Sequence, residues 1–371
     1  MTASGHRRTL KILHIDPERN WGGGEAQVFG LLGYMAAGGH LNVLAAHPDG
    51  ALFARCEKLD IQRYPIVIRN DCDLRCVPGL RRLIRAGDYD IVHLHTKRAH
   101  ALSLWLPRGR RRPKYLVTRR MDYRERCSAY AQHIYNRRVD GVVAISRSIA
   151  GLLIAAGVER NRLRVIPSGV DTCRFSNIPR VKYSLQGSVR KTVVGCVGIL
   201  EERKGYRFLL EAAARLKAKG LLLGYRIAGA GSLRQPLERQ AARLGLNDDV
   251  EFLGFVDDAA AFLAGIDVFV MPSLFEGLGV AALEAMAASK PVIASRVGGL
   301  AESVVDEVTG LLVAPGDDAQ LAEAIEKMHR DPALAIALGQ RGRERVQEHF
   351  SLEQMASQNE AYYYDLLDAV N

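Results

Sequence analysis

Two glutamates, Glu276 and Glu284, stand eight residues apart in the segment S-L-F-E-G-L-G-V-A-A-L-E-A-M-A. Gly277 and Gly279 in this segment allow a ligand to approach the backbone closely. An ionised carboxylate only accepts hydrogen bonds, and a phosphate would repel it. We therefore expect Glu276 to accept hydrogen bonds from neutral sugar hydroxyls and Glu284 from a second diol, such as a ribose. In the alternative interpretation, both are surface residues of a packing helix.

The surrounding pattern predicts the elements that would position these glutamates. An apolar run over residues 266–271 predicts a buried strand, residues 280–288 have the composition of a helix, and residues 292–294 open the next strand. The loop 274–279 thus follows the carboxyl end of a strand, where open α/β sheets bind ligands. The N-terminus of the following helix, with its free N–H groups and partial positive charge, suits a phosphate.

A second loop, G-I-L-E-E-R-K-G, follows the predicted strand 193–197. Its Lys204 stands near the start of the predicted helix 206–219, where the helix dipole disfavours a cation. A bound diphosphate would resolve that conflict, and a solvated surface lysine is the alternative. A third loop, G-A-G-S, begins at Gly229 after the predicted strand 225–228, but an isolated G-x-G is a weak signal.

Glycines also gather near the start of the chain, in W-G-G-G-E. Gly22, Gly23 and Gly24 lie between a predicted strand, 9–16, and a predicted helix, 26–38. Glycine permits both a positive φ and close contact with a ligand, although a simple strand–helix turn would use it too. The pattern is not G-x-G-x-x-G, so it gives little support to a binding site for NAD.

Histidine and arginine end two further strands of the first half. His93 and His95 are two apart on the predicted strand 90–95, so they point to the same face of the sheet. A metal site would need further ligands that the sequence does not identify, and we predict none. Arg120 follows the predicted strand 114–118. It cannot act as a base because it stays protonated, but it could bind an anionic acceptor, steady a leaving diphosphate or form a structural ion pair.

Strands and helices alternate in both halves of the 371 residues, which predicts two doubly wound α/β domains with the site in the cleft between them. We place the first domain at residues 1–173 and the second at residues 174–351, with a polar linker over 172–190. No segment supplies the roughly 20 apolar residues of a membrane span. The six cysteines include no C-x-x-C pair, which favours reduced cytosolic thiols over a disulfide framework or a metal site.

Charge is divided unevenly between the halves. Residues 1–173 hold 29 Lys and Arg against 15 Asp and Glu, whereas the remainder holds 22 against 26. The basic half suggests an anionic partner, whether lipid, phosphorylated glycan or nucleic acid. The apolar stretch 99–106 beside the basic stretch 107–114 suits an anionic membrane surface, with a solvated loop as the alternative. No aromatic stacking pattern accompanies it, so we expect no nucleic acid.

The segment around Glu276 and Glu284 resembles the E-x7-E signature of retaining glycosyltransferases of family 4, also called glycosyl transferases group 1, which have the GT-B fold. S-x-F-E-G-x-G and E-A-M-A both match. I-P-S-G-V-D followed by Phe175 is similar to the family's I-P-x-G-V-D, and Lys204 matches its G-R-L…K-G motif. W-G-G-x-E with T-R-R also resembles transferases of surface-polysaccharide and lipopolysaccharide assembly. The resemblance extends along nearly the whole chain.

This resemblance implies two Rossmann-like domains facing a central cleft, an acceptor domain followed by a donor domain, with the helix 352–371 packing back on the first. It implies catalytic roles for Glu276, Lys204, Arg120 and His95. The implied donor-binding residues are Gly22, Gly23, Gly24, Arg203, Lys204, Gly229, Phe255, Val256, Glu276, Gly277, Leu278, Gly279 and Glu284. The chain departs from the family pattern where Arg120 replaces a histidine and where Ile199 replaces an arginine, for which Arg203 would substitute.

We therefore predict a retaining hexosyltransferase that needs neither metal nor cofactor. Its donor would be a nucleotide-diphosphate sugar, with UDP favoured over GDP, and its acceptor a glycan or lipid-linked molecule of surface-polysaccharide or lipopolysaccharide synthesis. We expect it in the cytoplasm, with peripheral contact at the inner membrane. The alternatives are a nucleotide-sugar epimerase on the same fold and a non-enzymatic protein that binds anionic lipid or nucleic acid. An NAD oxidoreductase fits least well, because neither half carries the full fingerprint.

Overall fold

The computed structural model describes residues 8–71, 73–108, 113–122, 127–176, 178 and 191–369. The chain divides into two compact units: unit 1 is Met1–Gly169 with Leu352–Asn371, and unit 2 is Val170–Ser351. The sequence-based boundary was residue 173. The centre of the basic stretch, residues 109–112, and most of the predicted linker lie outside the described residues.

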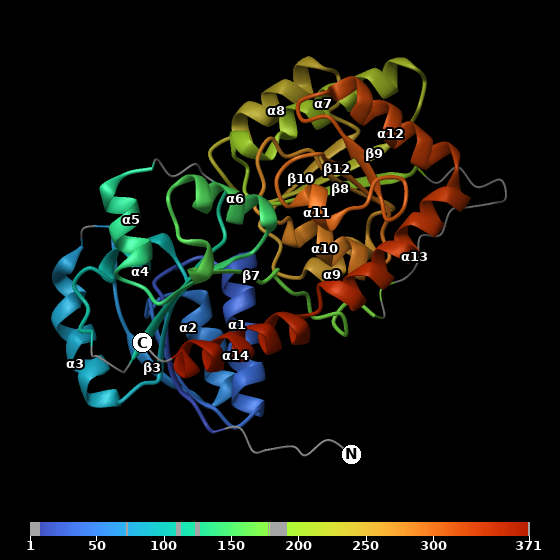
Figure 1. Ribbon diagram of the computed structural model, residues 1–371. Helices are drawn as coiled ribbons and strands as arrows, with labels where there is room; N and C mark the ends of the chain where they lie inside the picture. Colours follow the sequence, from blue (N-terminus) through green and yellow to red (C-terminus); the bar gives the residue numbers. More distant parts are fainter. Residues whose placement is uncertain are drawn as a thin grey trace, which may run out of the picture. The chain divides into compact units, whose positions relative to one another are not determined.

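Unit 1 is built on a parallel sheet of seven strands in the order β3-β2-β1-β4-β5-β6-β7 (Figure 1). The order reverses between β1 and β4, so the carboxyl ends of these two strands form the switch point at which open α/β sheets bind ligands. The strands are β1 Lys11–Asp16, β2 Leu41–Ala46, β3 Gln62–Pro65, β4 Ile91–Leu94, β5 Lys114–Arg119, β6 Gly141–Ala144 and β7 Leu163–Val165.

The first helix and the last helix of the chain pack side by side against this sheet (Figure 1). Leu31 of α1 and Tyr363 of α14 share a buried core with Ile12 of β1. Gly30 permits the close approach of α1 to α14, because a Cβ at this position would lie 2.3 Å from the Leu352 side chain. The helices of unit 1 are α1 Gly23–Ala37, α2 Ala51–Arg55, α3 Val77–Gly87, α4 Lys97–Leu102, α5 Ala129–Asn136, α6 Arg147–Ala155 and α14 Leu352–Asp368.

Unit 2 repeats the plan with six parallel strands in the order β10-β9-β8-β11-β12-β13. Its switch point lies between β8 and β11. The two doubly wound α/β domains predicted from the sequence are therefore confirmed. The strands are β8 Val193–Val197, β9 Gly224–Ala228, β10 Val250–Gly254, β11 Val268–Met271, β12 Val292–Ser295 and β13 Leu311–Val313.

Four helices of unit 2, α7, α8, α12 and α13, bury Leu209, Leu237, Ile325 and Leu338 in one core against the sheet. The helices are α7 Tyr206–Ala218, α8 Arg234–Arg243, α9 Ala259–Ala264, α10 Val280–Ala287, α11 Leu300–Ser303, α12 Asp318–Arg330 and α13 Pro332–His349, and a 3-10 turn, η4, covers Glu202–Lys204. Helix α13 was not predicted from the sequence. The buried face of α13 includes Gly339 and Gly342, so it lacks the large apolar repeat that marks a helix.

Two expectations for unit 1 are corrected. Helix α1 begins at Gly23 rather than at residue 26, so Gly23 and Gly24 are helical and Gly22 is an extended N-cap. None of these three glycines has a positive φ. The apolar stretch 99–106 is helical only to Leu102, and its apolar residues apart from Trp105 are mostly buried in the unit. These apolar residues therefore pack mainly inside the unit, and contact with an anionic membrane stays a prediction. Among the described helices, none combines the length and the hydropathy needed to cross a bilayer.

Candidate functional site

Two loops cross at the switch point of unit 2. One follows β8 and contains η4, and the other follows β11. The Leu274 N–H donates to the Arg203 carbonyl oxygen at 2.7 Å. Gly205 has a φ of 68°, and a Cβ there would lie 2.0 Å from the carbonyl oxygen of Pro272. Only glycine fits this crossing, because any side chain would collide with backbone.

The crossing brings Lys204 and Glu276 together. The Lys204 Nζ donates to Glu276 Oε2, and each side chain of this ion pair is only 12% exposed. Ser273 Oγ donates to the same carboxylate oxygen at 3.4 Å. The two residues that the sequence singled out in separate loops are thus direct partners. Because Lys204 neutralises Glu276, a diphosphate could approach this edge without meeting an uncompensated carboxylate.

Helix α10 starts beside this ion pair. Its N-cap, Gly279, has a φ of 83° and no side-chain cap, so the first N–H groups of the helix lack a capping acceptor. Glu284 lies farther along α10, where burial raises the pKa of its carboxyl to about 7, with Arg174 opposing the shift. Within the described ranges, no donor hydrogen-bonds this carboxylate. It is therefore available to accept hydrogen bonds from a ligand.

Several of the predicted donor-binding glycines have packing roles of their own. A Cβ on Gly229 would lie 1.9 Å from the Gly198 carbonyl oxygen, because the loops after β8 and β9 touch there. Gly277 is buried, and its carbonyl oxygen lies 2.2 Å from where a Cβ of Gly299 would be. Leu278 is 2% exposed, so only its backbone could meet a ligand. Their donor-binding roles stay predictions.

Apolar side chains are exposed at the same carboxyl edge of this sheet. Phe255 follows β10 and is 62% exposed, Ile199 follows β8 and is 52% exposed, and Phe275 follows β11 and is 61% exposed. Val256 is half-buried. The Arg203 Nε donates to Glu201 at 3.1 Å, so its guanidinium is tied to its own loop. Exposed aromatic faces at the carboxyl edge of a parallel sheet suit a flat apolar ligand group.

At the switch point of unit 1, the structure joins three predicted site residues. The Arg120 Nη1 donates to the His95 carbonyl oxygen at 2.7 Å, and Nη2 lies 3.4 Å from His95 Nδ1. A Cβ on Gly24 would contact Arg120 Cδ at 3.6 Å, which places the start of α1 against the arginine. Gly22 and Gly23 are exposed beside it.

Two carboxyls that sequence reasoning missed stand at this edge, Asp16 at the end of β1 and Glu25 in the first turn of α1. Asp16 is 1% exposed, and its Oδ1 accepts the Glu18 N–H at 3.1 Å. Burial and the charge of Glu25 raise the pKa of Asp16 to about 7, although Arg120 opposes the shift. Burial likewise raises the pKa of Glu25. The feature of the sequence that could have identified Asp16 is its place at the last position of a predicted strand.

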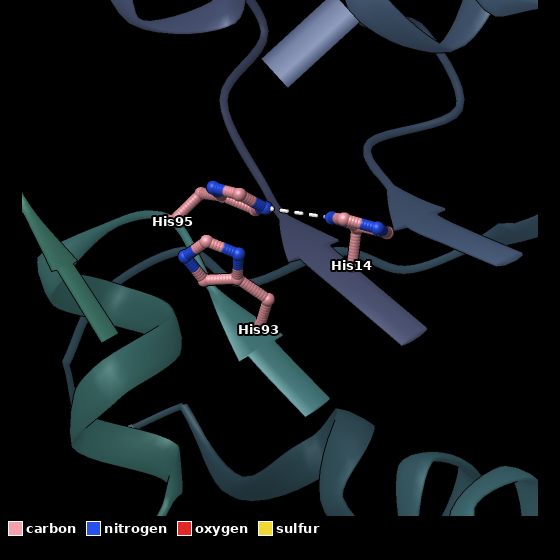
Figure 2. Close-up of side chains that lie close together, drawn as sticks. All are labelled: His14, His93 and His95. Atoms are coloured by element: carbon pink, nitrogen blue, oxygen red, sulfur yellow. Dashed lines mark hydrogen bonds between the residues drawn. The ribbon is translucent and has the colours of Figure 1, made fainter. Parts of the chain in front are cut away.

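His14, His93 and His95 form a buried cluster (Figure 2). Arg120 contacts this cluster through His95, and its third member, His14, was also missed. His14 of β1 pairs in register with His93 of β4. The His14 Nδ1 lies 3.0 Å from His95 Nε2, with ring planes only 9° apart, while His93 lies beneath the His95 ring at 3.9 Å between centroids. The feature of the sequence that could have identified His14 is the presence of a histidine within an otherwise apolar strand.

Ring nitrogens of these three histidines come within 4.8 Å of one another, a spacing that could gather a metal ion. A shared metal would need all three lone pairs to converge, whereas the His93 ring lies beneath the His95 ring, with the two ring planes 34° apart. The two nitrogens of His93 are also engaged, at 2.8 Å from the Tyr363 hydroxyl and 2.7 Å from Thr118 Oγ1. We interpret the cluster as a hydrogen-bonded network of neutral imidazoles, because burial lowers the pKa of each ring.

Two known families match the chain. Residues 21–174 match Glycosyltransferase Family 4, and residues 182–345 match Glycosyl transferases group 1. A lipopolysaccharide core biosynthesis glycosyltransferase of Rhizobium meliloti is 35% identical over 68% of this chain and 72% of its own length. This chain belongs to the family 4 glycosyltransferases. The resemblance that the two glutamates indicated is thereby confirmed.

Two further relatives are similar to this chain, one over a longer and one over a shorter part of it. A lipopolysaccharide core biosynthesis mannosyltransferase of Rhizobium leguminosarum is 30% identical over 72% of this chain and 82% of that enzyme. A 2-deoxystreptamine glucosyltransferase of Streptomyces kanamyceticus is 34% identical over 62% of this chain, and the match spans only 62% of that enzyme's length.

Solved structures agree on the fold of this glycosyltransferase. One from Rickettsia africae superposes with a TM-score of 0.83 at 21% identity, covering 98% of this chain and 100% of that one. HepE of Anabaena, solved with UDP and glucose, gives a TM-score of 0.80 at 23% identity, covering 96% and 100%. The predicted GT-B fold is confirmed by this likeness.

The loop crossing in unit 2 makes a first prediction. Gly205→Ala should destabilise the protein by about 2 kcal/mol or more beyond Gly220→Ala, because both replace a glycine of positive φ but only Gly205 faces backbone. Urea unfolding followed by circular dichroism measures the difference. Equal losses in the two variants would show that the crossing is not tight.

The buried carboxyl of unit 1 makes a second prediction. Folded Asp16 keeps its proton up to about pH 7, whereas an unfolded aspartate releases it near about pH 4. Folding therefore binds a proton, and Asp16 costs stability as the pH rises through that window. Asp16→Asn should raise the unfolding free energy at about pH 8 by up to about 4 kcal/mol and change it little at about pH 4.

The exposed Asp49→Asn serves as the control for this experiment, with urea unfolding at both pH values as the measurement. A loss of stability in Asp16→Asn that is equal at both pH values would contradict the prediction. That result would mean that Asp16 is ionised in the folded protein throughout the range.

Proposed function

We propose that this glycosyltransferase moves a hexose, with retention of anomeric configuration, from a nucleotide-diphosphate sugar to a glycan or lipid-linked acceptor of surface-polysaccharide or lipopolysaccharide synthesis. UDP is the favoured nucleotide over GDP, and the reaction needs no metal or other cofactor. The protein acts in the cytoplasm. Its basic first half supports peripheral contact with an anionic membrane.

The observation that carries this proposal is the Lys204–Glu276 ion pair beside the uncapped start of α10. A leaving diphosphate gains negative charge as the bond to the sugar breaks, and an ammonium with free helix N–H groups stabilises that charge. Glu276 then accepts hydrogen bonds from the sugar hydroxyls. Glu284, on the same helix, accepts from the ribose, and Phe255 and Val256 contact the base.

The part of the proposal that concerns unit 1 rests on its switch point, where Gly22, Gly23 and Gly24 are predicted to bind the donor and Arg120 to bind an anionic acceptor or the leaving diphosphate. Gly22 and Gly23 leave the start of α1 open, and Arg120 presents a permanent positive charge close by. A phosphate or carboxylate on the substrate would complement that charge. Arg120 replaces the histidine of the family pattern and cannot take a proton, so it binds and orients rather than acting as a base.

The names of the relatives support the choice of pathway and donor. Two relatives are named for lipopolysaccharide core biosynthesis, and HepE was solved with UDP-glucose as well as with UDP. The relatives differ in the sugar that their names give. One is a mannosyltransferase, one is a glucosyltransferase and one is named only as a glycosyltransferase, so the proposal names a hexose and no particular sugar.

A third prediction concerns the donor. One nucleoside diphosphate among UDP, GDP and ADP should stabilise unit 2 against heat, by about 2.7 kcal/mol at 100 times its Kd. Lys204→Ala should weaken that affinity by about tenfold to about a hundredfold, because it removes a charged hydrogen bond to the diphosphate. Each variant is compared with its own ligand-free midpoint, since Lys204→Ala also leaves Glu276 without its cation.

Two further variants complete this experiment. Lys219→Ala removes an ion-paired lysine at the far end of α7 and should leave the affinity unchanged. Glu276→Gln should weaken binding of the nucleotide sugar more than binding of the nucleoside diphosphate, because only the sugar offers it hydroxyls. No stabilisation by any of the three nucleotides would contradict the donor site, and stabilisation by RNA alone would favour the nucleic-acid-binding alternative.

A fourth prediction concerns the reaction. With the matching nucleotide sugar and a lipopolysaccharide or lipid extract, the protein should release nucleoside diphosphate and form a glycoside whose anomeric configuration, read by NMR, equals that of the donor. Glu276→Gln should lose most of this activity, while Glu302→Gln, on the neighbouring helix α11, should keep it. Conversion of one nucleotide sugar into another without release of nucleoside diphosphate would identify an epimerase instead.

A further inference from the structure

A line of polar groups crosses the three neighbouring strands behind Arg120. His95 directly follows β4, His14 lies on β1, and Asn42 lies on β2, so the line runs across the sheet through its apolar interior. The His95 Nε2 is 3.0 Å from His14 Nδ1, and His14 Nε2 is 3.2 Å from Asn42 Oδ1. Figure 2 shows the two rings meeting edge to edge. Buried groups placed in this way are satisfied only if each donor faces an acceptor.

The far end of the line fixes its direction. The Asn42 Nδ2 donates to the His40 carbonyl oxygen at 3.3 Å, so the amide oxygen of Asn42 faces His14. His14 must then donate from Nε2, which leaves its Nδ1 as an acceptor in the neutral ring. His95 consequently donates from Nε2. Its own Nδ1 carries a lone pair, and this atom faces the Arg120 guanidinium.

Arg120 depends on that lone pair. Its hydrogen-bond partners among the described residues are both atoms of His95, the carbonyl oxygen at 2.7 Å and Nδ1 at 3.4 Å, and its buried Nε has none. If His95 carried its proton on Nδ1 instead, an N–H would face the N–H groups of a guanidinium that always stays charged. The guanidinium would then lose its orientation at the carboxyl edge of the sheet.

We propose that His14 and Asn42 are positioning residues that hold His95 in the Nε2–H form, so that His95 orients Arg120 to bind an oxyanion of the substrate. The oxyanion part rests on the proposed function, and the tautomer part does not. The oxyanion belongs to the donor's diphosphate or to a phosphate or carboxylate of the acceptor. Burial lowers the pKa of Arg120, and the nearby carboxyls of Asp16 and Glu25 oppose that shift.

The direct test is the protonation pattern of the imidazole rings in the free protein. Long-range proton–nitrogen NMR of protein labelled with ¹⁵N-histidine reports which ring nitrogen carries hydrogen. His14 and His95 should each show one form, Nε2–H, unchanged between about pH 5 and about pH 8, because burial keeps both rings neutral. Assignment uses His14→Gln and His95→Gln. A proton on Nδ1 of His95 would overturn the proposal.

A variant of Asn42 tests the coupling. Asn42→Leu removes the acceptor for His14 Nε2 and should make both tautomers of His95 visible. Thr118→Val is the matched control, since it removes a hydrogen bond of His93 from the same core and leaves the line intact. An unchanged His95 in Asn42→Leu, or an equal change in Thr118→Val, would overturn the proposal.

The side-chain signals of Arg120 and binding affinities then test oxyanion recognition. Titration with UDP represents the donor, and titration with inorganic phosphate or acetate represents the acceptor. The probe that shifts the Arg120 Nε–H signal identifies the source, and its Kd should rise about tenfold in Arg120→Gln and in Asn42→Leu but not in Thr118→Val. A shift with none of these probes would overturn the oxyanion role, whereas a lack of glycosyl transfer with the expected tautomers would count only against the proposed function.

Discussion

The ion pair of Lys204 with Glu276 is the interaction on which the predicted donor-binding edge of unit 2, here called the donor edge, depends. A carboxylate that is only 12% exposed needs a partner, and its lysine comes from a different loop. The two loops must therefore cross closely enough for Gly205 to press against the Pro272 carbonyl oxygen. The pair fixes the approach of both loops, neutralises the carboxylate and keeps an ammonium beside the start of α10. Packing and proposed chemistry thus share the same atoms.

In unit 1, too, the buried polar groups at the switch point need partners, but the groups are of other types. This switch point lies at the carboxyl ends of the neighbouring strands β1 and β4. The polar groups described there are an arginine, two carboxyls and three histidines rather than one ion pair. Burial keeps the histidines neutral, so they can pass on a hydrogen-bond direction without adding charge. A buried network of this kind is most stable when its polar atoms have hydrogen-bond partners, and those hydrogen bonds restrict the movement of its side chains. Its rigidity is what makes Arg120 a fixed group instead of a mobile surface cation.

The two departures from the family pattern change charge in opposite directions. Ile199 removes a cation from the donor edge and is 52% exposed, close in sequence to the Arg203 that is tied to Glu201. Arg120 adds a cation to the edge of unit 1, where a histidine would titrate. In unit 2, Lys204 stays paired with Glu276 beside the helix N–H groups. In unit 1, Arg120 adds a cation whose own charge does not vary with pH near neutrality.

The sequence by itself determined the alternation of strands and helices, the two sheets and the loops that carry Lys204, Glu276 and Gly24, because apolar runs, glycines and helix-forming residues act locally. The similarity of its motifs determined the family. Only the tertiary structure decided which residues meet: Lys204 with Glu276, and Arg120 with His95. His14 and Asn42 were missed because each is a single polar residue within a strand, and its spacing along the chain does not show which residue it contacts. Their partners come from neighbouring strands, and the sheet order sets that proximity across 28 to 81 residues of sequence.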